Sequence, residues 1–286
     1  MDWPSLLSGR PLPVIMGVVN VTPDSFSDGG RFFDPEHAIE HGTRLAGEGA
    51  AILDIGGEST RPPRYGIAEE VSASEEIGRV VPVVERLARL KVPISIDTRK
   101  SEVARAALAA GAAIVNDVTA MRHDPAMAGL VASREACVIL MHMRGTDPRT
   151  MQSNLAYDDL LGEVRNFLSD AAAGAVRAGI APARIAVDPG LGFSKSAAQS
   201  LTLLREIGSL HDLGFPVVVG ASRKNFVRIY SGAREKGPPA ELLAGSLACA
   251  AIAAERGAAV ARVHDVAETA AFLKMYRANE NVTMKA

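Results

Sequence analysis

Polar and charged residues follow several short apolar runs, and their types suit the binding of a flat heterocycle together with an anion. Asp97, Asn116 and Asp188 are two carboxylates and an amide, and a carboxylate accepts paired N–H bonds from the edge of an amino-pyrimidinone ring. Cations that suit phosphate stand at comparable places: Arg61, Lys224, Arg262 and His264. The set predicts one site for a nitrogen heterocycle and a phosphate.

A metal ion fits the same chemistry. Asn20 ends the first apolar run and offers a hard oxygen ligand on a polar loop. Such an oxygen suits Mg²⁺, which usually binds few protein oxygens and completes its shell with substrate phosphates and water. The chain has no recognisable Ser-His-Asp arrangement, no cysteine in a polar setting and no zinc-ligand spacing. We therefore expect catalysis by positioning and charge stabilisation rather than through a covalent intermediate.

The apolar runs are the elements that must position these groups. Eight of them, rich in Val and Ile, alternate with stretches of helical periodicity. Each run is almost wholly apolar, as expected of parallel strands covered on both faces. The predicted strands are Pro13–Val19, Ala51–Ile55, Pro93–Ile96, Ala113–Val115, Cys137–Met141, Ile185–Val187, Pro216–Val219 and Ala259–Val263.

This alternation predicts an α/β fold, a closed (β/α)₈ TIM barrel, with a doubly wound open sheet as the alternative. A barrel builds its site where the strands end, so the polar groups would meet at one rim. No linker or internal repeat divides the chain, and we expect a single domain over residues 1–286 with its core at about 13–275.

Composition narrows the class of protein. Of the 286 residues, 48% are apolar and 22% charged, near the globular average, which argues against a disordered or fibrous chain. The net charge of −2 gives no indication of a nucleic-acid partner. The sequence contains no run of about 18 consecutive apolar residues, so it predicts no membrane-spanning helix. The N-terminus does not resemble a signal peptide and both cysteines lie in apolar runs, so we expect a cytoplasmic protein.

Eight motifs at the predicted strand ends resemble those of dihydropteroate synthases, in the same order. They are N-V-T-P-D-S-F-S-D-G-G at 20–30, D-I-G-G-E-S-T-R-P at 54–62, S-I-D-T at 95–98, N-D-V at 116–118, L-M-H-M at 140–143, D-P-G-L-G-F at 188–193, S-R-K at 222–224 and R-V-H-D at 262–265. The resemblance implies a folate-pathway transferase and sulfonamide target. Such an enzyme joins 6-hydroxymethyl-7,8-dihydropterin diphosphate to p-aminobenzoate with Mg²⁺, releases pyrophosphate and forms a homodimer.

The resemblance also implies a role for individual residues. The pterin pocket matches Asp97, Asn116, Met141, Asp188 and Lys224. Arg262 matches a residue that packs on the pterin and faces phosphate, with His264 beside it and Asn20 on the Mg²⁺ and diphosphate loop. The implied catalytic set is Asn20, Asp97, Lys224, Arg262 and His264.

The p-aminobenzoate side of the site follows from the same comparison of motifs. The loop that closes over this substrate matches Thr60, Arg61 and Pro62, and an aromatic wall matches Phe193. Two positions depart from the family pattern. Pro63 replaces a usual glycine, and Asn225 replaces a frequent serine near the expected substrate carboxylate.

Other interpretations stay open at this point. A pterin-binding methyltransferase would share the barrel and the ring pocket but would not need Asn20, Arg262 and His264. A non-catalytic pterin-binding module should have lost the loop residues around Asn20 or Arg61. Two single residues also have plain structural interpretations: His142 as a core histidine and Asp54 as a cap of the following loop.

Overall fold

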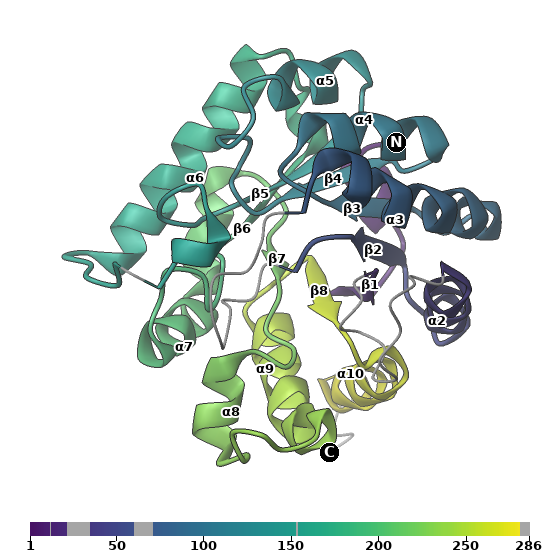
Figure 1. Ribbon diagram of the computed structural model, residues 1–286. Helices are drawn as coiled ribbons and strands as arrows, with labels where there is room; N and C mark the ends of the chain where they lie inside the picture. The colour runs from purple at the N-terminus through teal and green to yellow at the C-terminus, as the bar shows by residue number, and fades with distance from the viewer. Residues whose placement is uncertain (12, 22–34, 60–70, 153, 281–286) are drawn as a thin grey trace.

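The eight predicted strands form one curved sheet. The computed structural model describes residues 1–11, 13–21, 35–59, 71–152 and 154–280. All neighbouring strands are parallel, in the order β6-β5-β4-β3-β2-β1-β8-β7. An isolated bridge between Val187 and Val217 joins the two outer strands, so the sheet is a nearly closed barrel ringed by helices (Figure 1). The (β/α)₈ prediction is confirmed, and the open-sheet alternative is wrong.

Each strand lies at one of the predicted apolar runs. The strands are β1 (Val14–Asn20), β2 (Ile52–Gly56), β3 (Ile94–Asp97), β4 (Ile114–Asp117), β5 (Cys137–Met141), β6 (Ile185–Asp188), β7 (Val218–Val219) and β8 (Val260–Val263). β7 is shorter than its predicted run because Pro216 has no N–H to donate to a neighbouring strand. Its carbonyl still accepts from Val187 N–H at 3.0 Å.

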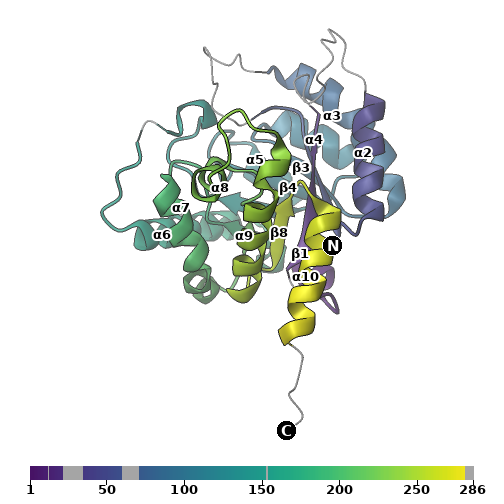
Figure 2. The ribbon, with the colours of Figure 1, turned by 90° about the horizontal axis from the view of Figure 1, so that it is seen from below.

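Except for the first, the helices cover the outside of the barrel. They are α1 (Trp3–Leu7), α2 (Pro35–Gly47), α3 (Ala73–Leu87), α4 (Ser101–Ala110), α5 (Met127–Ser133), α6 (Leu160–Arg177), α7 (Ala197–Arg205), α8 (Asn225–Ser231), α9 (Leu243–Glu255) and α10 (Val266–Glu280). In the view turned by 90°, α2 and α3 lie on one side of the barrel and α6 and α7 on the other (Figure 2). Within the described ranges, no helix combines the length and the apolar character that crossing a membrane requires.

The short helix α1, near the N-terminus of the chain, packs against the barrel strands. Trp3 is fully buried, and its indole Nε1 donates to the carbonyl of Arg184, which precedes β6, at 3.2 Å. Asp2 caps the helix by accepting from Ser5 N–H at 2.8 Å. The barrel side chains that form one apolar cluster with Trp3 include Val14, Met16, Ile52, Ile114 and Ile139.

We expect Trp3→Phe to lower the free energy of unfolding by about 1–3 kcal/mol, because the smaller ring leaves a cavity and the Arg184 carbonyl loses its donor. Urea unfolding measures this change. Leu90→Ala removes a side chain that is 38% exposed and should shift the unfolding free energy by less than about 0.5 kcal/mol. A Trp3→Phe variant as stable as Leu90→Ala would contradict the packing described here.

Candidate active site

The strands bring the predicted ring-binding groups to the C-terminal rim, the edge at which the strands end. Asp97 on β3 pairs with Asn116 on β4, and Gly56 on β2 pairs with both Asp97 and Asn20. On the next strands, Met141 pairs with Asp188. Side chains far apart in the sequence therefore meet because parallel strands end together.

Arg262 lies between two carboxylates at the centre of this rim. Its Nε donates to Asp54 Oδ2 at 2.6 Å, and its Nη2 donates to Asp97 Oδ2 at 2.7 Å. Asn116 Nδ2 donates to the same Asp54 oxygen at 3.2 Å. Asp54 is fully buried, and its Oδ1 has no hydrogen-bond partner among the residues that the structure describes. Asp54, in the middle of β2, thus positions both Arg262 and Asn116.

The charges of this cluster perturb one another. Burial raises the pKa of Asp97 to about 7, although the guanidinium of Arg262 pulls it down. Burial also disfavours the charged form of Arg262, but Asp54 and Asp97 together hold the pKa of Arg262 above its ordinary value. Two carboxylates around one guanidinium leave the cluster with a formal excess of negative charge, which suits a ligand with N–H donors.

Asp188 and Lys224 form the other half of the rim. Asp188 Oδ1 accepts from Gly190 N–H at 2.6 Å, and burial raises the pKa of this carboxyl against the opposing charge of Lys224. Lys224 Nζ donates to the carbonyl of Leu191 and lies 4.7 Å from the ring centroid of Phe193. Burial lowers the pKa of Lys224 to about 8. The structure therefore brings together Asp188, Lys224 and Phe193, as predicted.

The loops after β7 and β8 place the groups expected at an anion. His264 N–H donates to Ser222 Oγ at 3.2 Å, and His264 Nδ1 lies 3.2 Å from the same oxygen. Arg223 forms an ion pair with Asp265 and ties these loops together a second time. Asn20 stands exposed at the end of β1. Arg262 and His264 lie two residues apart at the end of β8.

Of the residues predicted to bind p-aminobenzoate, some lie within the described ranges and others do not. Asn225 begins α8, and its Oδ1 accepts from Arg228 Nε at 3.0 Å and Nη2 at 2.6 Å. The amide oxygen is therefore engaged, while the amino group of Asn225 makes no hydrogen bond within the described ranges. The predicted residues Thr60, Arg61 and Pro62, and the departure Pro63, lie outside the described residues.

A network of charged residues that the sequence analysis did not single out lies beside β2 and β3. Glu58 forms ion pairs with Arg99 at 3.3 Å and with Lys100 at 2.9 Å, and Lys100 also reaches Glu76 at 2.7 Å. Arg99 is only 4% exposed. The sequence feature that could have identified Glu58, Arg99 and Lys100 is that they are charged and lie just after strand ends. The network joins the ends of β2 and β3 to α3.

His142 has the surroundings of a structural residue. It is 3% exposed, its ring packs edge-on against Phe167 at 4.8 Å, and Lys195 Nζ lies 2.8 Å from its Nδ1. Burial lowers the pKa of His142 to about 2, so the imidazole is neutral at physiological pH. These contacts favour the interpretation of His142 as a core histidine.

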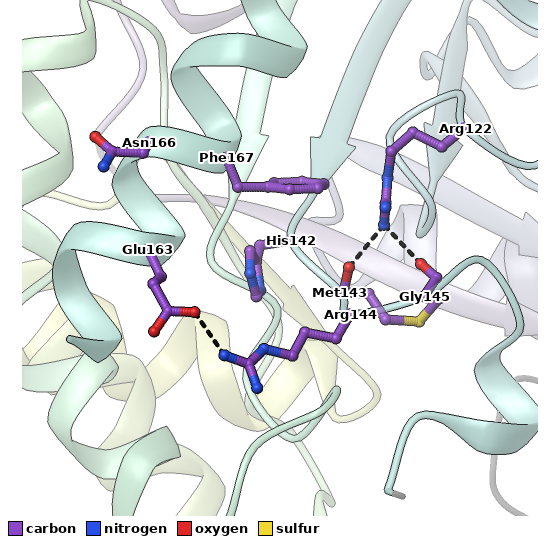
Figure 3. A pocket seen from close by; sticks show the side chains of 8 residues that line it. All are labelled: Arg122, His142, Met143, Arg144, Gly145, Glu163, Asn166 and Phe167. Atoms are coloured by element: carbon purple, nitrogen blue, oxygen red, sulfur yellow. Dashed lines mark hydrogen bonds and ion pairs between the residues drawn. The ribbon is translucent and has the colours of Figure 1, made fainter. Parts of the chain in front are cut away.

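An open hollow of about 400 Å³ lies beside His142, between α6 and the loops after β4 and β5 (Figure 3). Arg122 Nη2 donates to the carbonyls of Met143 and Gly145 there, and Arg144 pairs with Glu163 of α6. None of the predicted site residues lines this hollow. The candidate site is therefore the cluster at the strand ends.

Comparisons with known proteins identify the family of the chain. A family described as "Pterin binding enzyme" matches residues 16–264. The dihydropteroate synthase of Synechocystis sp. is 45% identical over 264 residues, covering 91% of this chain and 88% of the relative. That of Escherichia coli is 43% identical over 267 residues, covering 93% and 91%.

Solved structures extend the similarity to three dimensions. Dihydropteroate synthase of Xanthomonas albilineans with 4-aminobenzoic acid superposes with a TM-score of 0.86 at 46% identity, covering 95% of this chain and 94% of that one. The same enzyme in complex with 7,8-dihydropteroate gives a TM-score of 0.83 at 44% identity, covering 95% of each chain. The chain belongs to the pterin-binding enzyme family and, within it, to the dihydropteroate synthases, which are transferases.

Proposed function

We propose that this protein condenses 6-hydroxymethyl-7,8-dihydropterin diphosphate with p-aminobenzoate, giving 7,8-dihydropteroate and pyrophosphate. One observation carries the proposal: the acids and the amide of β3, β4 and β6 meet Arg262 of β8 and Lys224, which precedes α8, at a single rim. Relatives whose structures hold 4-aminobenzoic acid and 7,8-dihydropteroate support the choice of substrates. A pterin-binding methyltransferase has less support, because it does not need the cations at the anion position.

The ring would bind between Asp97, Asn116 and Asp188. Carboxylates there accept the N–H donors of the pterin edge, and Lys224 donates to a ring acceptor. Arg262 Nη2 donates to Asp97 Oδ2 at 2.7 Å. An incoming ring must therefore replace that contact, while the bond from Arg262 Nε to Asp54 keeps the guanidinium near the site.

Mg²⁺ is the proposed cofactor, and Asn20 is the residue that would hold it. Asn20 offers one neutral oxygen at the exposed end of β1. Over the described ranges, no group of three or more His, Cys, Asp or Glu side chains could hold a metal. A single protein oxygen fits an ion whose other ligands come from a substrate diphosphate and water. When bound, the ion would neutralise part of the diphosphate charge.

The residues of this chain supply position and charge rather than a strong base. As the C–O bond of the pterin methylene breaks, its electron pair leaves with pyrophosphate, which Arg262 and His264 face. Asp97 and Asp188 stabilise the positive charge that develops on the ring and methylene. The neutral arylamine nitrogen has a free lone pair, so it bonds to the methylene carbon without activation by a side chain. The proton that it then loses passes to the released pyrophosphate or to water.

The arylamine substrate would lie between the ring site and α8. Phe193 provides an aromatic wall, and the amino group of Asn225 provides a donor for the substrate carboxylate. Thr60, Arg61 and Pro62 complete this proposed site.

We also propose a cytoplasmic homodimer. Ile229 and Tyr230 of α8, 48% and 56% exposed, are two of the exposed large hydrophobic side chains that such an interface could cover, and sedimentation would measure the mass.

Lys224 should give pterin binding a characteristic pH dependence. Its pKa of about 8 means that the amine is charged below this pH and neutral above it. We therefore expect affinity for the pterin diphosphate to fall about ten-fold as pH rises through 8, because a charged hydrogen bond is lost. Calorimetric titrations at several pH values would measure the decline.

Lys224→Met should bind more weakly below pH 8 and should lack this decline, while its melting temperature stays near that of the wild type. Lys274→Met, at an exposed position of α10, should keep the wild-type profile. If the decline through pH 8 persists in Lys224→Met, another group is responsible.

The proposed reaction is tested by pyrophosphate release. Release should require the pterin diphosphate, p-aminobenzoate and Mg²⁺ together, and a sulfonamide should compete with p-aminobenzoate. Tight pterin binding without release under these conditions would instead indicate a binding module. Release that does not depend on p-aminobenzoate would indicate a hydrolase and overturn the proposal.

A further inference from the structure

Lys195 is a buried lysine between β6 and α7 that no step of the proposed reaction uses. It is 3% exposed. Its Nζ lies 2.8 Å from His142 Nδ1, 3.3 Å from the His142 carbonyl and 2.8 Å from the Phe193 carbonyl. These three acceptors match the three N–H bonds of an ammonium group. Within the described part of the chain, no carboxylate forms an ion pair with it.

A charged amine at this place is costly. Burial lowers the pKa of Lys195 well below its ordinary value, and the charge of Asp188 opposes that shift only in part. A buried charge is unfavourable unless hydrogen bonds compensate it. A methionine would fill nearly the same space without a charge, so apolar packing alone does not explain a lysine here.

The bonds of Lys195 join the loop after β5 to the turn after β6. His142 follows directly on β5, and Phe193 lies in the 190–194 turn. Two further contacts hold the same segments together. Ser194 Oγ accepts from Arg144 N–H at 3.1 Å, and Gly190 packs so closely that a Cβ there would lie 2.0 Å from the His142 carbonyl oxygen. Lys195 adds three side-chain hydrogen bonds to these contacts, two to His142 and one to Phe193.

The 190–194 turn carries the aromatic wall of the site. Lys195 fixes the backbone of Phe193 through its carbonyl. The Phe193 ring lies 4.7 Å from Lys224 Nζ, and Lys224 also donates to the carbonyl of Leu191 in this turn. A shift of the turn would therefore move the Phe193 ring and the point on which Lys224 rests.

We propose that Lys195 is a positioning residue that holds the 190–194 turn so that Phe193 faces the p-aminobenzoate side of the site. The inference rests on the proposed function for the identity of the arylamine substrate. The role of Lys195 in holding the turn does not depend on that function. Lys195 acts through the turn and touches neither substrate. Its loss should affect arylamine binding most, because the Phe193 ring itself moves, and pterin binding less, because Lys224 is hydrogen-bonded to this turn only through the Leu191 carbonyl.

The test compares Lys195→Met with the wild type in steady-state kinetics. The KM for p-aminobenzoate should rise about ten-fold or more, because a small misplacement of a substrate-contacting group has a large effect. The KM for the pterin diphosphate should change much less. Lys195→Gln keeps N–H donors and should recover part of the loss, while Lys274→Met at an exposed position should match the wild type. Equal rises in both KM values, or no rise, would overturn the proposal.

A crystal structure of Lys195→Met separates this inference from the proposed function. We expect the 190–194 turn to shift relative to the wild type, whether or not the wild type releases pyrophosphate. A turn that keeps its position would overturn the inference even if the enzyme is a dihydropteroate synthase. If Lys195→Met does not fold, Lys195→Gln serves for the same comparison, with a smaller shift expected. Wild-type activity alone decides the proposed function.

Discussion

Asp188→Asn is expected to weaken binding of the pterin diphosphate by about 2–4 kcal/mol, or roughly 30- to 1,000-fold in Kd. The asparagine oxygen still accepts from Gly190 N–H, as Asp188 Oδ1 does at 2.6 Å. The other carboxylate oxygen becomes an NH₂ group, which meets the ring donors as a second donor. Asp188 is 5% exposed, so water cannot take over the lost contact.

Isothermal titration with the pterin diphosphate measures this loss directly. Asp170→Asn makes the same chemical change at an exposed position of α6 and should leave the Kd unchanged. The melting temperature of Asp188→Asn should stay near that of the wild type or rise, because a buried charge is removed. A variant that binds as tightly as the wild type would exclude Asp188 from the ring site.

Arg262→Met should affect stability and activity together. Its removal leaves Asp54, fully buried, and Asp97, mostly buried, without their shared cation. Breaking a buried ion pair on one side costs about 3–5 kcal/mol of unfolding free energy. The kcat should fall roughly 10²- to 10³-fold, because a charge that stabilises the leaving diphosphate is lost.

A second substitution separates the two effects. Asp54→Asn combined with Arg262→Met removes one of the uncompensated charges and should regain at least about 1 kcal/mol of stability, since contacting residues are energetically coupled. It should not regain activity. Arg205→Met, whose side chain is 67% exposed on α7, should change neither quantity. If the double variant regains kcat, the role of Arg262 is structural only.

The barrel could be predicted because its strands are buried on both faces. Runs such as Cys137–Met141 are wholly apolar and buried in the structure, so they stand out against amphipathic helices. The role of α1 could not be predicted. Trp3 is fully buried because it packs against side chains from several strands that lie far apart in the sequence. The five residues of its helix are too few to show a periodic pattern.

The site could be predicted as a set of residue types, but its contacts could not. Strand ends that coincide in a barrel are enough to place Asp97 beside Asn116. The hydrogen bond from Arg262 to Asp54 joins residues that are 208 positions apart in the sequence. It depends on the conformation of the Arg262 side chain. The contact of Lys195 with His142, 53 positions away, depends likewise on the path of the 190–194 turn.

A crystal structure of the protein with the pterin diphosphate bound tests the central claim most directly. We predict that the ring lies between Asp97, Asn116 and Asp188, with Lys224 within hydrogen-bonding distance of it and the diphosphate toward Arg262. In that structure, Arg262 Nη2 should have left Asp97 Oδ2. A ring bound elsewhere, for example in the hollow beside His142, with Arg262 still on Asp97, would contradict the account.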